Sequence, residues 1–362
     1  MLASVYNHAP IKSPLFIKNS ENFVVEEKQL YDWSNQGEWL ILKIRKKDLT
    51  THELLKIFSE RIGVKTRDIG YAGLKDKHGM TIQNISIPKR FLSKIEKFKH
   101  PKIKILEKHI HSNKLKIGHL KGNRFFIRLK KVNPTDAKKI NKVLKEIKKY
   151  GIPNYFGYQR FGRDNSALQG KQIIEGELVI RNRAVEKLLI NAYQSELFNE
   201  WLTERINLSN IFNEFDEKEL ANKYPKELIK FVKSQKHPFK LLNGDVMCHY
   251  PFGKNFYFED IDDSLRFYKK EIVPTGLLPG KKALRAKGLA REIEEKFDDI
   301  VPANGDRRSA WIFPEIEEKR YIREKAWYEV AFTLPKGSYA TVMIEIIKNG
   351  ISENLVTYKG GE

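Results

Sequence analysis

The residues with the clearest potential for chemistry lie in one short charged segment, residues 73–78, which reads GLKDKH. Asp76 stands between Lys75 and Lys77, and neighbouring positive charges favour the ionised form of a carboxylate. An ionised carboxylate can act as a nucleophile. A solvated turn whose charges serve solubility would have the same composition. The segment therefore marks Asp76 as a candidate catalytic residue that needs support from elsewhere in the chain.

A second cluster spans residues 153–163 and reads PNYFGYQRFGR. It gathers four aromatic residues with Asn154, Gln159, Arg160 and Arg163. This mixture can stack on nucleobases, form hydrogen bonds with base edges and hold phosphates. An aromatic core strand followed by a capped turn is an equal alternative, because Phe and Tyr also build protein cores.

Positive charge is concentrated in one part of the chain. The 362 residues include 67 Lys and Arg against 46 Asp and Glu, which gives a formal net charge of +21. Residues 88–150 hold 21 of these basic residues and only 4 acidic ones. Such a stretch is typical of proteins that bind nucleic acid. A lysine-rich surface that serves only solubility is the alternative.

Several kinds of site are not expected. The sequence contains no P-loop, no GxGxxG after a predicted strand, no HExxH and no GxSxG. Four histidines occur close together but among lysines and without thiols, so no metal site is expected there; they are His100, His109, His111 and His119. The single cysteine, Cys248, fits a reducing cytoplasm. No secretory signal is expected, and no apolar run reaches the ~20 residues of a membrane span.

The elements that must position the two clusters alternate between strands and helices. Short β-rich runs predict strands at 23–25, 39–42, 69–73, 82–87, 102–106, 124–130 and over 331–347. A capping box at Thr50–Glu53 predicts a helix that ends at Gly63, and Asn133-Pro134 begins another. A long amphipathic helix is predicted from about Asn182. Strand-rich ends around a more helical middle predict a domain interrupted by an insertion.

Seven segments follow one another along the chain: NFVVEE at 22–27, GLKDK at 73–77, GHLKGNRF at 118–125, PNYFGYQRFG at 153–162, NAYQSELFN at 191–199, PTG at 274–276 and LPKGSYAT at 334–341. In order and spacing they resemble the TruD family of tRNA pseudouridine synthases. The resemblance implies an α+β protein with the pseudouridine synthase fold, a mixed, largely antiparallel sheet flanked by helices. It also implies an inserted second α+β domain. We expect the split catalytic domain at 1–169 and 313–362, and the inserted TRUD-type domain at 170–312.

The resemblance also implies an activity and a set of site residues. Family members isomerise a uridine of tRNA to pseudouridine, at position 13 in bacteria, without a cofactor. Asp76 matches the catalytic aspartate, which either attacks C1′ or promotes elimination through a glycal, and Lys18 matches a lysine near it. Positions that line the target base are matched by Phe23, Asn154, Phe156 and Tyr339. Tyr339 stands where the bacterial prototype has Phe, which retains the aromatic face and adds a hydroxyl.

The expected protein is therefore a cytoplasmic, monomeric enzyme that binds tRNA and needs neither a metal nor a small-molecule cofactor. A non-catalytic RNA-binding protein that retains the synthase fold is the alternative from another class, and the intact Asp76 counts against it. A glycosidase-like or nucleoside-hydrolysing enzyme is a weaker alternative. Such enzymes use two carboxylates about 5–10 Å apart, and the acids that could accompany Asp76 are Asp68 and the more distant Glu26 and Glu27.

Overall fold

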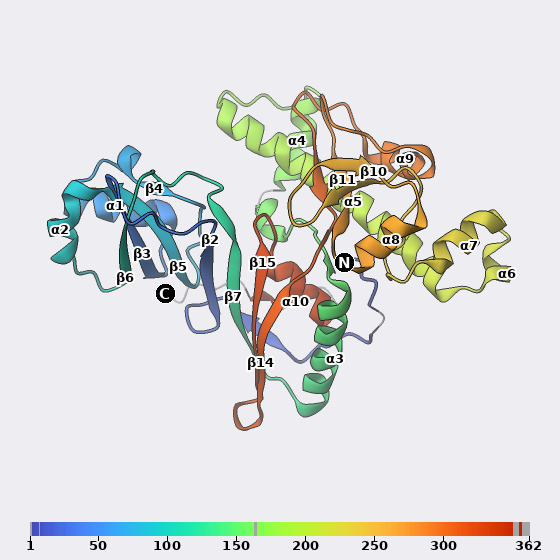
Figure 1. Ribbon diagram of the computed structural model, residues 1–362, viewed down its shortest axis with the longest axis horizontal. Coiled ribbons are helices and arrows are strands. Elements are labelled where there is room, and N and C mark those ends of the chain that lie inside the picture. Colours follow the sequence, from blue (N-terminus) through green and yellow to red (C-terminus); the bar gives the residue numbers. More distant parts are fainter. Residues whose placement is uncertain (1, 7, 163–164, 350–354, 357–362) are drawn as a thin grey trace. The chain divides into compact units, whose positions relative to one another are not determined.

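The computed structural model describes residues 2–6, 8–162, 165–349 and 355–356 (Figure 1). The chain divides into two compact units. The unit that we call the sheet unit comprises Lys12–Asn141, Glu315–Gly337 and Ser352–Glu362. The unit that we call the helix-rich unit comprises Met1–Ile11, Lys142–Pro314 and Ser338–Ile351. Each unit is described by itself below.

The sheet unit is built on a ten-stranded sheet whose main path runs β14-β15-β7-β2-β5-β3-β6 (Figure 1). Along this path the β2–β5 pair is parallel and the other neighbours are antiparallel. The strands are β1 (Leu15–Ile17), β2 (Phe23–Gln29), β3 (Trp39–Lys47), β4 (Gly70–Tyr71), β5 (Met80–Pro88), β6 (Ile103–His111), β7 (Leu120–Lys130), β14 (Glu315–Ile322), β15 (Trp327–Pro335) and β16 (Leu355–Val356). The predicted mixed, largely antiparallel sheet is confirmed.

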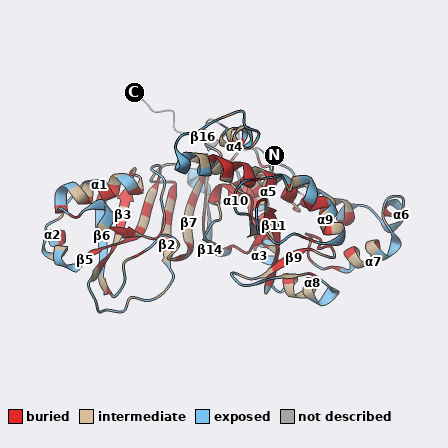
Figure 2. Ribbon diagram, turned by 90° about the horizontal axis from the view of Figure 1, so that it is seen from above, coloured by how far each residue is buried: buried red, intermediate tan, exposed pale blue. Residues whose placement is uncertain are grey.

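Helix α1 (Thr51–Ile62) covers one face of this sheet. It begins at the predicted capping box, in which the Thr50 side chain accepts from the Glu53 N–H, and it ends at Gly63 in the left-handed conformation. Its apolar face meets the inward side chains of β3 and β5 in one buried core. Figure 2 shows the contrast between these buried strand residues and the exposed outer turns of α1. The short α2 (Leu92–Glu96) precedes the edge strand β6.

The helix-rich unit is organised around the long helix α5 (Arg183–Glu214), which begins at the predicted Asn182 cap. Its small sheet has the order β10-β9-β11-β12, and β8 pairs with β13. The remaining elements are α3 (Pro134–Tyr150), which enters from the sheet unit, β8 (Ile152–Pro153), α4 (Ser166–Ile174), α6 (Glu217–Leu220), α7 (Lys226–Ser234), β9 (Val246–His249), β10 (Asn255–Tyr257), α8 (Ile261–Tyr268), β11 (Ile272–Leu278), α9 (Gly288–Glu294), β12 (Asp306–Ser309), β13 (Trp311–Ile312) and α10 (Ala340–Lys348).

The bounds of the two units differ from the predicted domain boundaries. Residues 170–312 lie in the helix-rich unit together with 142–169, which we assigned to the catalytic domain. The reason is local packing: Trp311 pairs with Pro153, and its ring lies 5.2 Å from Phe239 and 5.3 Å from His237. A compact unit need not coincide with an inserted segment, so the predicted insertion remains a prediction.

The second half of the predicted strand 331–347 is a helix. β15 ends at Pro335, and α10 then runs over Ala340–Lys348. Its sequence is rich in β-branched residues, which favour strands as isolated segments. In the folded chain nearly every one of these side chains is buried around the helix. Tertiary burial therefore overrides local preference at this position.

Candidate active site

The catalytic candidate Asp76 lies on the loop 72–79, which connects β4 to β5. Its side chain is 64% exposed, and its Oδ2 lies 2.6 Å from the Nζ of Lys18. Lys18 directly follows β1, and its own side chain is only 15% exposed. A charge-assisted bond of this length is a strong hydrogen bond. The structure therefore brings together two predicted site residues that lie 58 positions apart, and it leaves the carboxylate open to a ligand.

Phe23, the first residue of β2, lies beside this pair. The Lys18 Nζ is 5.3 Å from the centre of the Phe23 ring. On the other side, a Cβ at Gly79 would come within 3.0 Å of both the ring and the carbonyl oxygen of Phe23. Gly79 also has φ +126°, which side-chain-bearing residues rarely adopt. The absence of a side chain at Gly79 thus lets the loop pass closely over Phe23.

A buried ion pair joins the loop 72–79 to β2. The Lys75 Nζ lies 2.9 Å from Glu27 Oε1, and the two side chains are 9% and 1% exposed. Glu27 Oε2 also accepts a hydrogen bond from the backbone N–H of Asn84, at 2.9 Å. Lys75 therefore points inward, whereas Lys77 on the same loop is half-exposed and lies 3.5 Å from Glu53. Of the two lysines that flank Asp76, Lys77 is the one accessible to a phosphate.

Lys46 is a site residue that the sequence reasoning missed. Its side chain is buried, and its Nζ donates to the carbonyl oxygens of Leu49 and Asp76, the latter at 3.3 Å. Lys46 continues the inward row of Leu42 and Ile44 on β3. A lysine on the apolar face of an alternating strand is the signal that could have found it. This ammonium group ties the backbone of the loop 72–79 to the end of β3.

The titration of Lys46 gives a testable prediction. Burial lowers its pKa from 10.5 to about 8, against an opposing effect of the Asp76 charge. Between pH 8 and 10.5 the unfolded chain therefore holds more protons than the folded chain, and folding stability gains up to about 1.4 kcal/mol per pH unit from this group. Lys46→Met lacks the titration. We expect the unfolding free energy of the wild type to rise relative to that of Lys46→Met across this range.

Urea unfolding at pH 7, 8, 9 and 10 measures this difference. Lys47→Met is the matched control, because Lys47 is the exposed neighbour on the same strand. Its unfolding free energy should follow that of the wild type at each pH. Identical pH dependence in the wild type and Lys46→Met would show that the prediction is wrong.

The second group of predicted residues lies in the helix-rich unit. Asn154 follows β8 and is buried, and its side-chain N–H donates to the Ser309 carbonyl at 2.9 Å. Its backbone and side-chain oxygens both accept from the guanidinium of Arg308, each at 3.0 Å. These contacts use one N–H and one lone pair of the side-chain amide, which has two of each. The second N–H and the second lone pair of the Asn154 amide have the donor and acceptor character that the edge of an imide requires.

Phe156 and Tyr339 lie together, with ring centres 6.2 Å apart. The Arg308 guanidinium lies 3.9 Å from the centre of the Phe156 ring, a cation–π contact. Burial lowers the pKa of Arg308 to about 10, so it remains charged at neutral pH. The Asn199 side chain accepts from the N–H of Phe156 and donates to its carbonyl. Arg308 and Asn199 were not predicted, although Asn199 ends one of the resembling segments.

The six predicted residues thus form two groups, one in each unit. Asp76, Lys18 and Phe23 meet in the sheet unit, and Asn154, Phe156 and Tyr339 meet in the helix-rich unit. Arg163 of the aromatic cluster lies outside the described residues. Within the described ranges, no group of three or more metal-ligating side chains occurs. No helix in the described part of the chain combines the length and apolar character of a membrane span.

Comparison with known proteins decides the family. Residues 15–185 and 178–346 match the family model described as tRNA pseudouridine synthase D (TruD). The chain belongs to the TruD family. It is 54% identical over 346 residues to the tRNA pseudouridine synthase D of a Nitratiruptor species, covering 94% of this chain and 96% of that protein. The enzyme of the same name from Wolinella succinogenes is 54% identical over 345 residues, covering 94% and 95%.

A solved structure supports the fold of this TruD-family chain. The crystal structure of a Methanosarcina mazei protein assigned as a tRNA pseudouridine synthase D superposes with a TM-score of 0.64. The match covers 96% of both chains at 22% sequence identity. The shared fold confirms the α+β pseudouridine synthase architecture expected from the sequence.

Proposed function

We propose that this protein is a tRNA pseudouridine synthase that isomerises one uridine of tRNA, at position 13, with Asp76 as its catalytic carboxylate. The observation that carries the proposal is the Lys18–Asp76 pair. The exposed Asp76 carboxylate lies 2.6 Å from the partly buried Lys18 ammonium. The loop that carries Asp76 is held in place by Lys46 and Lys75. A positioned, ionised carboxylate beside an open surface is what chemistry at a ribose C1′ requires.

The reaction breaks the N1–C1′ bond of uridine, rotates the uracil and forms a C5–C1′ bond. N1 gains a proton and C5 loses one, so atoms balance without any redox partner. Asp76 either attacks C1′ or promotes elimination through a glycal, and both routes use its ionised form. Lys18 orients the carboxylate through the one oxygen it contacts, which leaves the other oxygen for the ribose. The proposal includes no metal and no cofactor.

We assign Phe23, Asn154, Phe156 and Tyr339 to binding of the target nucleotide. A uridine inside folded RNA must leave its stack, which costs a few kcal/mol. Stacking on an aromatic side chain returns about 1–3 kcal/mol per base. The Asn154 amide, held by Arg308, can bond the uracil edge. Packing within each unit supports these roles, and the assignment to one nucleotide is carried over from the family resemblance.

The proposal has further parts. The protein is a cytoplasmic monomer, and residues 170–312 form an inserted domain. The basic stretch contacts the tRNA backbone. The non-catalytic alternative requires that Asp76 and its supports have no chemical role. Burying the Lys46 ammonium, whose pKa is lowered by burial, costs folding free energy. A protein that only bound RNA would gain nothing from that cost, which counts against the non-catalytic alternative.

The test is to incubate unmodified tRNA transcripts with the purified protein and to map pseudouridine by carbodiimide modification and primer extension. We expect one product, at uridine 13. A transcript with cytidine at position 13 is the matched control and should give none. Product at another position would confirm the reaction and correct the site, whereas tight tRNA binding without product would favour the non-catalytic alternative.

A further inference from the structure

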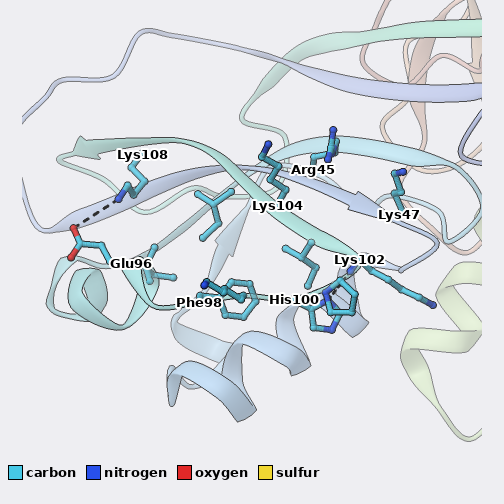
Figure 3. Close-up of a pocket in the computed structure, with 13 residues that line it drawn as sticks. Arg45, Lys47, Glu96, Phe98, His100, Lys102, Lys104 and Lys108 are labelled. Carbon is cyan, nitrogen blue, oxygen red and sulfur yellow. Dashed lines mark hydrogen bonds and ion pairs between the residues drawn. The ribbon is translucent and has the colours of Figure 1, made fainter.

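An open groove of about 530 Å³ lies at the β6 edge of the sheet unit (Figure 3). It is formed by the end of α2, the loop that follows, β6 and the neighbouring β3. Six basic side chains line it: Arg45, Lys47, Lys99, Lys102, Lys104 and Lys108. In Figure 3, Arg45, Lys47 and Lys104 point the same way from adjacent strands. Among the described residues that line the groove, Glu96 is the only acidic one.

These positive charges are largely uncompensated. Lys108 lies 3.9 Å from Glu96. In the part of the chain that the structure describes, the other five have no carboxylate within ion-pair distance. Like charges that line one groove repel one another, and a bound polyanion relieves that repulsion. The groove is therefore matched to a chain of phosphates rather than to a neutral or cationic ligand.

Two flat rings also line the groove, on the side of the strands opposite to the one from which Arg45, Lys47 and Lys104 point (Figure 3). Phe98 and His100 lie with their ring centres 6.4 Å apart and their planes within 6° of parallel. Burial, then the charges of Arg61 and Lys102, lowers the pKa of His100 and so favours its neutral ring. Its Nδ1 accepts the backbone N–H of Lys102 at 3.1 Å. The β6 edge thus offers basic side chains on one side and aromatic faces on the other, the two kinds of group that hold nucleic-acid strands.

The groove begins next to the catalytic loop within the same unit. The Lys47 N–H donates to the Lys102 carbonyl at 3.0 Å, and Lys47 pairs in register with Met80 at the start of β5. Met80 directly follows the loop that carries Asp76. The neighbouring Asp48 N–H donates to Gly79 of that loop at 3.2 Å. One end of the groove therefore adjoins the loop that carries Asp76.

We propose that this groove, here called the β6-edge groove, binds the phosphate backbone of the RNA substrate in the segment adjoining the target nucleotide. The ligand class is a phosphodiester chain, and its identity as tRNA rests on the proposed function. Lys47, Lys102 and Lys104 contact phosphates, and Phe98 with His100 contacts a base or ribose. The role of the basic stretch 88–150 in binding RNA is thereby assigned to particular side chains of one groove.

The test compares the wild type with the triple variant Lys47→Gln/Lys102→Gln/Lys104→Gln. Equilibrium affinity for an unmodified tRNA transcript is measured by filter binding from 50 to 300 mM salt. The slope of log affinity against log salt is negative, and each lost phosphate contact makes it less steep by about 0.7–0.9, so the triple variant should reduce its steepness by about 2–3. At 100 mM salt we expect a Kd at least about tenfold higher than that of the wild type.

The matched control is Lys223→Gln/Lys226→Gln/Lys230→Gln, which removes the same charge from exposed positions at and beside α7. Thermal unfolding verifies that both triple variants are folded, and Lys102→Arg/Lys104→Arg keeps the charges and should keep the affinity. An unchanged salt slope in the groove variant, or an equal loss in the control, would overturn the proposal. The measurement reports affinity, so a loss of binding in the groove variant is distinguishable from a loss of pseudouridine formation.

Discussion

Replacing Asp76 with Asn should abolish pseudouridine formation while leaving tRNA affinity close to that of the wild type. Asn has nearly the same shape but carries no charge and is a poor nucleophile. We expect the single-turnover rate with saturating tRNA to fall at least about 10³-fold, the order of loss that follows removal of a nucleophile. The affinity for tRNA should not fall, because the Asp76 carboxylate repels the phosphates of the RNA and its removal takes away no attractive contact with them. Filter binding with the same transcript measures this second quantity.

Asp68→Asn is the matched control for this change. Asp68 lies in the same unit, eight residues before Asp76, in a short 3₁₀ turn over Thr66–Asp68. Its replacement should leave the rate within about twofold of the wild type. An enzyme that hydrolyses a glycosidic bond with two carboxylates would lose activity when the second acid is removed. A rate for Asp76→Asn above one hundredth of the wild-type value would contradict the assigned role.

The second large effect is expected for Arg308→Met. Arg308 holds both oxygens of Asn154 and covers Phe156, so we treat it as a positioning residue. Losing hydrogen bonds from a charged donor costs about 1.5–3 kcal/mol, which corresponds to a fall of about 10- to 150-fold in kcat/KM. Steady-state kinetics that separate kcat from KM measure this effect. Arg308→Lys should be intermediate, because an ammonium cannot reproduce both contacts and the stacked face.

A structural defect must be separated from a positioning defect in this variant. Arg183→Met is the control, since Arg183 is an exposed arginine at the start of α5 in the same unit. Both variants should be compared with the wild type by thermal unfolding and by kinetics at a temperature where all three are folded. If Arg308→Met keeps the wild-type kcat/KM there, Asn154 and Phe156 do not depend on Arg308 for their function.

The parts of the fold that could be predicted from the sequence are those determined by neighbouring residues. The capping box Thr50–Glu53 and Gly63 define both ends of α1 because these residues satisfy backbone groups of their own helix. The segment 340–348 could not be predicted in this way. Its β-branched residues form a helix because of what surrounds them, and that environment comes from distant parts of the chain.

The same distinction holds in the candidate site. Asp76 was marked by its own neighbours, and Lys18 by the family resemblance, and the structure pairs the two. Lys46 carried only one local mark, its place in the apolar row of β3, and Arg308 carried none. The role of each depends on a residue far along the chain: Lys46 contacts the loop 30 positions later, and Arg308 contacts a residue 154 positions earlier. Such supporting contacts depend on strand register and tertiary packing, which composition does not reveal.

The one parallel pair in the main path of the sheet has a consequence for how this enzyme can change. Because β2 and β5 run side by side in the same direction, Val24 pairs with Met80, and Phe23 and the end of the loop that carries Asp76 lie at the same end of the two strands. A residue inserted within β2 would turn Phe23 or Glu27 to the opposite face of the sheet. Lengthening the surface connection between β2 and β3 leaves that alignment intact. Evolution and protein engineers alike are therefore free to vary the connection, while the length of β2 itself is constrained by the alignment of Phe23 with the loop that carries Asp76.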